Sequence, residues 1–118
     1  MMIKKREEKR VDFRKLIICK RGDEIHPGFT QDISQHGIGI QTMQSLSISH
    51  KVRIALAIEH DSIFLDGEVR WAHEYTGAFA AKPREIGIHI PRPPADYLHL
   101  VAECSDRERP RPTPAPLK

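Results

Sequence analysis

The sequence predicts an all-β domain, an antiparallel barrel or sandwich followed by one C-terminal helix. Apolar residues recur with a period of two in short segments such as Val52, Ile54, Leu56 and Ile58, which predicts strands with one buried face. Turn signals separate these segments by roughly 8–12 residues, and the sequence lacks the strand–helix alternation of parallel sheets. A length of 118 residues suits one domain around one hydrophobic core.

Each expected strand is a short run rich in Val, Ile, Leu and Phe, bounded by residues that favour turns. Pro27-Gly28 is expected to break the chain before the second run, and Gly67 marks an expected bend or bulge in the fifth. The expected runs are 11–20, 29–34, 38–40, 52–58, 63–71, 78–81 and 86–90, with turns at 21–23, 35–37, 60–62 and 75–77.

A helix is expected after the strands, because Tyr97, Leu100, Val101 and Cys104 follow the spacing i, i+3, i+4, i+7. It should have about three turns and bury this face at the end of the barrel. The alternate prolines that follow predict an extended, disordered tail. The chain therefore divides into a basic arm (1–10), a barrel with its helix (11–105) and a Pro-rich tail (106–118).

Charge is distributed unevenly along the chain, although the net charge is only +3. Residues 1–21 hold nine Lys or Arg and three Asp or Glu, a net charge of +6, and residues 107–118 carry a net charge of +3. Residues 22–106 hold six basic and twelve acidic residues, a net charge of −6. An acidic body with basic ends is not typical of a barrel that binds nucleic acid, so the N-terminal arm should supply most of the attraction for an anionic partner.

The arm, residues 1–10, is almost entirely charged. Its Lys, Arg and Glu residues favour a helix, whereas its charge density favours a solvated, flexible segment. The sequence contains no apolar run long enough to span a membrane, and no apolar segment after the basic N-terminus that would indicate a secretory signal. Cys19 and Cys104 are therefore expected to be reduced thiols, and the expected location is the cytoplasm.

Two short motifs carry the chemistry. Arg6 and Arg10 lie four residues apart, so they project from the same side of a helix or of an extended arm. A guanidinium pairs bidentately with phosphate or with the O6/N7 edge of guanine, and it also stacks on a base. Asp32 can accept hydrogen bonds from the N1–H and N2–H₂ groups of a guanine. Ser34 lies two residues later, so in a strand its side chain is on the same face as that of Asp32. Gly37 permits a close approach of the backbone to a ligand.

Each motif alone has a structural interpretation as well. An Arg-x-x-x-Arg pattern is common in solvated basic arms, and Asp-x-Ser-x-x-Gly also fits an Asx-type turn between strands. Their joint occurrence, in this order and ahead of this pattern of strands, favours a site for a small ligand with phosphates and a hydrogen-bonding base.

With both motifs in place, the sequence resembles the PilZ domain family, the bacterial receptors for cyclic di-GMP. That family is marked by RxxxR on an N-terminal arm, followed by [D/N]xSxxG. The matching segments here are Arg6-Glu7-Glu8-Lys9-Arg10 and Asp32-Ile33-Ser34-Gln35-His36-Gly37. The segments 67–71 and 86–90 are similar to later strands of the family, and the resemblance covers roughly residues 4–104.

The resemblance implies a six-stranded antiparallel barrel with a C-terminal helix, and an arm that folds over the ligand. If the matching residues have the roles that they have in the family, Arg6 and Arg10 would contact phosphates and guanine. Asp32, Ser34 and Gly37 would then contact a guanine from the barrel side. It implies a non-enzymatic receptor or adaptor without a cofactor, which orders its arm on binding cyclic di-GMP and signals to an effector protein.

Two further positions follow from the resemblance. Lys5 precedes the first Arg, a position that influences in the family whether one or two stacked ligand molecules bind. Trp71 sits where some members place a residue against a guanine, whereas its alternation with Leu65 and Val69 favours the core or the rim of the barrel.

Three other functions compete with this interpretation. Asp32, Ser34 and His36 supply the residue types of a hydrolytic triad, but three residues of one turn rarely reach the required geometry. A barrel that binds RNA or single-stranded DNA would use exposed aromatics as stacking platforms, and this chain has four Phe, one Trp and two Tyr. A PilZ-like adaptor that has lost nucleotide binding is the third alternative. The histidines lack the spacing of metal ligands, so no metal is expected.

Overall fold

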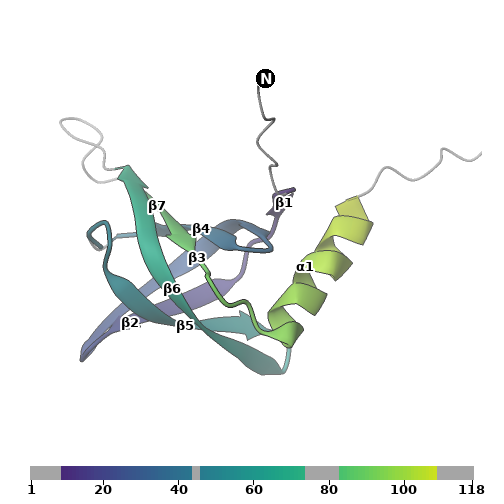
Figure 1. The fold of residues 1–118 in the computed structure, drawn as a ribbon, viewed down its shortest axis with the longest axis horizontal. Coiled ribbons are helices and arrows are strands. Elements are labelled where there is room, and N and C mark those ends of the chain that lie inside the picture. Colours follow the sequence, from purple (N-terminus) through teal and green to yellow (C-terminus); the bar gives the residue numbers. More distant parts are fainter. Residues whose placement is uncertain (1–8, 44–45, 74–82, 109–118) are drawn as a thin grey trace, which may run out of the picture.

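The structure is a computed structural model that describes residues 9–43, 46–73 and 83–108. The described chain consists of strands followed by one helix, as predicted (Figure 1). Most of the expected arm, the turn at 75–77, the run 78–81 and the end of the tail lie outside the described residues. The elements are β1 (Val11–Asp12), β2 (Leu16–Arg21), β3 (Glu24–Ser34), β4 (Gly37–Thr42), β5 (Lys51–Ile58), β6 (Asp61–His73), β7 (Arg84–His89) and α1 (Ala95–Glu108).

Strands β2 to β7 close into a barrel. Around the ring the order is β3, β2, β5, β6, β7 and β4, which returns to β3, and every pairing is antiparallel. This ring confirms the six-stranded antiparallel barrel and excludes the sandwich. The short strand β1 pairs with the edge of β3 that β2 also uses, so β1 and β2 behave as one strand interrupted at residues 13–15.

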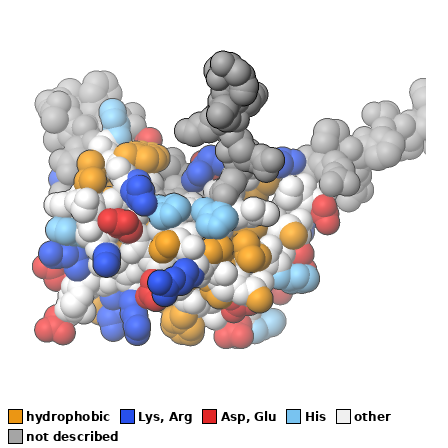
Figure 2. All heavy atoms as spheres, in the orientation of Figure 1, with side chains coloured by type: hydrophobic (Ala, Val, Ile, Leu, Met, Phe, Trp, Pro, Cys, Tyr) orange, Lys and Arg blue, Asp and Glu red, His pale blue; other side chains and the backbone are white. Residues whose placement is uncertain are grey.

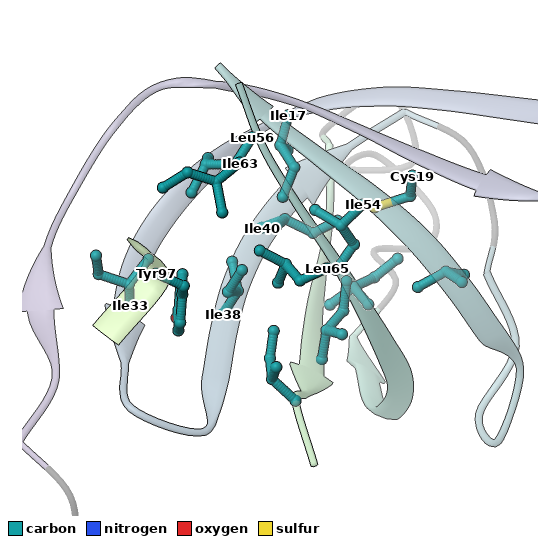
Figure 3. Packing of buried hydrophobic residues seen from close by; sticks show 14 of the residues in the cluster. Ile17, Cys19, Ile33, Ile38, Ile40, Ile54, Leu56, Ile63, Leu65 and Tyr97 are labelled. Carbon is teal, nitrogen blue, oxygen red and sulfur yellow. The ribbon is translucent and has the colours of Figure 1, made fainter. Parts of the chain in front are cut away.

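Aliphatic side chains from every strand of the ring fill the barrel (Figure 3). On β5 the buried residues Val52, Ile54 and Leu56 alternate with more exposed ones, as the period of two predicted. From α1, Tyr97 and Cys104 enter the same core. The other core residues are Val11, Ile17, Cys19, Ile33, Ile38, Ile40, Leu46, Ile63, Leu65, Val69, Ile86, Ile88, Ile90 and Val101.

Helix α1 packs against β1 and buries the apolar face that the sequence predicted (Figure 1). It has 14 residues and ends at Glu108, so it is longer than expected and passes beyond residue 105. None of the helical segments among the described residues has the length and apolar character needed to cross a membrane.

Strand β3 differs from the prediction, because Pro27-Gly28 does not break it. The strand runs without interruption from Glu24 to Ser34, and Pro27 pairs with Ile18 of β2. Pairing with β4 on the other edge begins only at Gly28, so the missing N–H of Pro27 removes no hydrogen bond between β3 and β4. The predicted break was wrong for this reason.

Two β-bulges reset the alternation of side chains. On β3 the register steps from Thr30 to Asp32 while β4 advances by one residue, and on β6 it steps from Val69 to Trp71 while β7 advances by one. An extra residue in one strand turns the following side chains to the other face. Thr30 and Val69 are therefore buried, whereas Asp32 and Trp71 reach the outer surface. The bulge expected near Gly67 lies after Val69 instead.

Replacing Ile40 by alanine should lower the free energy of unfolding by about 2–5 kcal/mol, because the buried side chain leaves a cavity. Urea unfolding followed by circular dichroism measures the change. Ile48→Ala is the matched control, since Ile48 is 58% exposed and its loss should cost less than about 0.5 kcal/mol. Equal effects of the two substitutions would contradict the assignment of Ile40 to the core.

Neither cysteine forms a disulfide, and both are buried, Cys19 on β2 and Cys104 on α1. Burial raises the pKa of the Cys19 thiol from 9.0 to about 12, because the thiolate would lose its hydration. Since the thiolate is the reactive form, Cys19 should resist iodoacetamide at neutral pH in the folded protein and react once urea unfolds it. Peptide mass spectrometry measures the labelling. Rapid labelling while the circular dichroism spectrum stays native would contradict the expectation.

Candidate functional site

A row of paired residues crosses the outer surface of four adjacent strands. Asp32 of β3 pairs with Gly39 of β4, Gly39 pairs with Gly87 of β7, and Gly87 pairs with Trp71 of β6. Directly paired residues of an antiparallel sheet share a face, so these four residues lie side by side. The two central residues are glycines without side chains, and both are buried.

Both central glycines are required by what lies over them. A Cβ atom at Gly39 would lie 2.6 Å from Oδ1 of Asp32, and a Cβ atom at Gly87 would collide with the indole ring of Trp71. The carboxylate and the indole therefore rest directly on backbone. The row thus presents the carboxylate of Asp32 beside the indole of Trp71, each lying over a glycine of the neighbouring strand.

Arg10 lies just before β1 and reaches across β3 to this row. Its Nε and Nη2 atoms donate to Oδ1 of Asp32, at 3.1 and 3.0 Å, and its Nη1 atom donates to Oγ of Ser34 at 3.4 Å. The side chains of Arg10 and Asp32 are 46% and 35% exposed. Water screens such a pair, so its net contribution to stability is about 0–1 kcal/mol and the guanidinium can exchange partners at small cost.

The turn that joins β3 to β4 is held from the inside by α1. The hydroxyl oxygen of Tyr97 lies 2.6 Å from the carbonyl oxygen of Ser34 and 2.9 Å from that of Gly37, within donating distance of both. A Cβ atom at Gly37 would lie 3.3 Å from Nη1 of Arg10, so a bare backbone lets the guanidinium settle here. Burial of Tyr97 in the core therefore fixes the position of the turn.

A shallow cavity of about 160 Å³ opens beside this row. In its wall the rings of His36 and His89 stack, with centroids 6.4 Å apart and planes inclined by 22°. A second guanidinium in the wall, that of Arg70, has its Nε atom 3.6 Å from Oε1 of Glu68. Figure 2 draws one face of the molecule, on which histidines lie next to one another among interspersed basic and acidic side chains. The lining is completed by Arg10, Gly37, Trp71, Gly87 and Ile88.

The structure brings the two sequence motifs together. The second arginine of RxxxR contacts the Asp and Ser side chains of DxSxxG, across 22 and 24 residues of sequence, and lies against the backbone of its Gly. Lys5 and Arg6 lie outside the described residues, so their roles stay predictions.

Trp71 lies at the rim of the barrel and is 47% exposed. Its alternation with Leu65 and Val69 favoured the core as one alternative, and that alternative is wrong because the bulge after Val69 turns the strand over. The ring lines the cavity instead, and its contact with a guanine stays a prediction.

Sequence reasoning missed several residues that shape the site, among them Arg70, Gly39, Gly87 and Tyr97. Gly39 and Gly87 each lie between two buried isoleucines. Because side chains alternate along a strand, the patterns at 38–40 and 86–88 could have indicated that these glycines face outward. Tyr97 was predicted to be buried, but no sequence pattern indicates which carbonyl groups its hydroxyl reaches.

The arrangement suits a ligand that is both anionic and aromatic. Arg10 and Arg70 present donor forks to phosphate oxygens, Asp32 accepts from N–H groups, and the indole of Trp71 offers an apolar face. In the described ranges, no three His, Cys, Asp or Glu residues converge as a metal ion would require. The chemistry of the site therefore resides in guanidinium, carboxylate and aromatic groups.

Comparison with known proteins identifies the family. The sequence profile described as PilZ domain matches residues 4–106, which include both motifs and the whole barrel. The chain belongs to the PilZ domain family. Among curated proteins, no sequence match to this PilZ domain is found.

Solved structures share the fold of this PilZ domain at low sequence identity. The PilZ domain with c-di-GMP of YcgR from Escherichia coli is 10% identical, with a TM-score of 0.70 over 88% of this chain and 94% of that one. The inhibitor of motility MotI/DgrA of Bacillus subtilis is 18% identical, with a TM-score of 0.70 over 90% of this chain and 52% of that one. The MrkH–c-di-GMP complex of K. pneumonia is 17% identical, with a TM-score of 0.63 over 90% and 57%. This chain thus spans little more than half of the MotI and MrkH chains.

Removing the hydroxyl of Tyr97 should destabilise the barrel by about 1–3 kcal/mol, because Tyr97→Phe removes a buried donor from the carbonyl groups of Ser34 and Gly37. Urea unfolding measures the loss. Leu98→Ala is a matched control on the same helix, since Leu98 is 38% exposed and should matter less. Unchanged stability in Tyr97→Phe would show that the hydroxyl does not hold the turn.

Proposed function

We propose that this PilZ domain is a cytoplasmic receptor for cyclic di-GMP that signals to an effector protein. The observation that carries the proposal is the contact of Arg10 with Asp32 and Ser34 beside a cavity walled by Trp71. The PilZ family is a family of cyclic di-GMP receptors, and the YcgR and MrkH structures are described as containing c-di-GMP.

The ligand carries two phosphates and two guanines, and each has a matching group. In the proposal Arg6 and Arg10 bind phosphates and the O6/N7 edge of one guanine. Asp32 accepts from the N1–H and N2–H₂ groups, with Ser34 and the bare backbone at Gly37 beside it. Trp71 supports a ring from the other end of the row. Lys5 occupies the position that influences in the family whether one or two ligand molecules bind, and the proposal leaves that number open.

The switch in this proposal is an exchange of partners by Arg10. Without ligand, the guanidinium is satisfied by Asp32 in an exposed ion pair of small net energy. When the ligand binds, its phosphate pairs with the guanidinium of Arg10 and its guanine pairs with the carboxylate of Asp32. The bound state therefore has contacts that the free state lacks. The arm, residues 4–10, closes over the ligand and forms a new surface for the effector. The domain acts as a receptor and does not turn the nucleotide over.

Isothermal calorimetry tests the proposal with cyclic di-GMP, GMP and a short single-stranded RNA. Cyclic di-GMP should bind with micromolar or tighter affinity. Arg10→Ala and Asp32→Ala should each weaken binding by about tenfold or more, because a hydrogen bond to a charged group contributes about 1.5–3 kcal/mol. Arg21→Ala is the charge-matched control and should leave the affinity unchanged, since Arg21 lies outside the candidate site and forms an ion pair with Glu24, at 3.9 Å.

Three results would decide against the proposal. Affinity for cyclic di-GMP that survives both Arg10→Ala and Asp32→Ala would place the ligand elsewhere. Preference for RNA with a steep dependence on salt would indicate a nucleic-acid-binding barrel. A well-folded protein that binds none of the three would be a PilZ-like adaptor without nucleotide.

A further inference from the structure

A second surface lies on the outer side of β2, β3, β5 and β6. Leu16 pairs with Phe29, and Ile18 pairs with Pro27 on one side and with Ala55 on the other. Since paired residues share a face, these side chains form a continuous patch that extends onto β6. The outer apolar face, as we name it, consists of Leu16, Ile18, Pro27, Phe29, Ala55 and Phe64, which pairs with Ala55.

The largest side chains of the outer apolar face are exposed in part, and the guanidinium of Arg14 lies over the ring of Phe29, 5.2 Å from its centroid. Phe64 is 71% exposed, Phe29 is 47% exposed and Leu16 is 43% exposed. Single exposed apolar residues need no explanation, but several in direct cross-strand contact on a small domain indicate an interaction surface.

One step further along the same strands, the surface turns from apolar to basic. Lys20 follows Ile18 on the outer side of β2 and pairs with Arg53 of β5, which pairs with Asp66 of β6. These residues line a groove of about 750 Å³. Its charged residues are Lys20, Lys51, Arg53, Arg92, Asp66 and Glu68, so basic groups outnumber acidic ones by four to two.

Both carboxylates of the groove already have arginine partners. Nε of Arg53 lies 3.5 Å from Asp66, and Nε of Arg70 lies 3.6 Å from Glu68. In the described chain, no ion pair engages Lys20, Lys51 or Arg92. Three cations beside an apolar patch are therefore available to carboxylates of a partner.

We infer that the outer apolar face and the basic groove together bind an acidic amphipathic segment of a partner protein. Its apolar side chains cover Phe64 and Ile18, and its carboxylates enter the groove. A second copy of this chain would place Lys20 against another basic groove. A nucleic acid binds mainly through its phosphates and would leave the apolar side chains of Leu16, Ile18 and Pro27 uncovered. The inference rests on the proposed function in one respect, since the partner it describes is the effector of the receptor.

The test uses the full chain without nucleotide, so that its failure is distinct from a failure to bind cyclic di-GMP. The probe is a fluorescein-labelled peptide in which Leu and Phe alternate with Glu, and the comparison peptide has Lys in place of Glu. Fluorescence anisotropy should detect binding of the acidic peptide alone. Phe64→Ser and Lys20→Glu should each weaken it by about tenfold or more, as loss of a central contact does.

Matched controls lie outside the surface. Met43→Ser alters an apolar residue of similar exposure, 57%, beyond the end of β4, and Arg107→Glu reverses a charge in the last turn of α1. Both should leave the affinity within about twofold, and circular dichroism should find all four variants folded.

Several outcomes would overturn the inference. These are absence of binding, equal binding of the lysine peptide, and unchanged affinity in both Phe64→Ser and Lys20→Glu. A dimer in sedimentation that Phe64→Ser abolishes would assign the surface to a second copy. Displacement of the peptide by single-stranded DNA would assign it to nucleic acid.

Discussion

The alternation of side chains along a β-strand is the constraint on which this structure depends. A strand that fills the core with every second residue must send the residues between them outward. Strands β3 and β6 escape this rule once each, through the bulges before Asp32 and before Trp71. Because of its bulge, each strand contributes side chains to the core along most of its length and a side chain to the candidate site near its end. The outward-facing glycines of β4 and β7, Gly39 and Gly87, complete the arrangement, since any larger residue would displace what the bulges bring there.

The turn between β3 and β4 is held by a core residue and also borders the candidate site. Tyr97 is a core residue by burial, yet its hydroxyl fixes the two carbonyl groups that flank this turn. The groups on the sheet side are thereby held by a side chain of the buried core. The guanidinium of Arg10, by contrast, is held by a partly exposed ion pair. A fixed half and an exchangeable half are what a receptor needs, because only the exchangeable half can respond to a ligand.

The candidate ligand site and the outer apolar face draw on the same two strands. Strand β6 carries Phe64 in the outer apolar face and Trp71 at the candidate site, and β3 likewise carries Phe29 and Asp32. The face and the ligand site are thus separated along each strand by one bulge. A rigid barrel can therefore present both to different partners without a change in its core.

The sequence by itself determined the strands, the closing helix and the two motifs that identify the family. The periodicity of apolar residues depends only on residues close together in the sequence. The alternation on β5 and the helix face around Tyr97 could therefore be predicted. The register of the strand pairs could not be predicted, because it depends on which residues pair between strands that are distant in the sequence. For that reason the continuity of β3 through Pro27, the outward turn of Trp71 and the meeting of Asp32 with Arg10 were decided only by tertiary structure. A one-residue shift in pairing turns every later side chain to the opposite face, and no local pattern records such a shift.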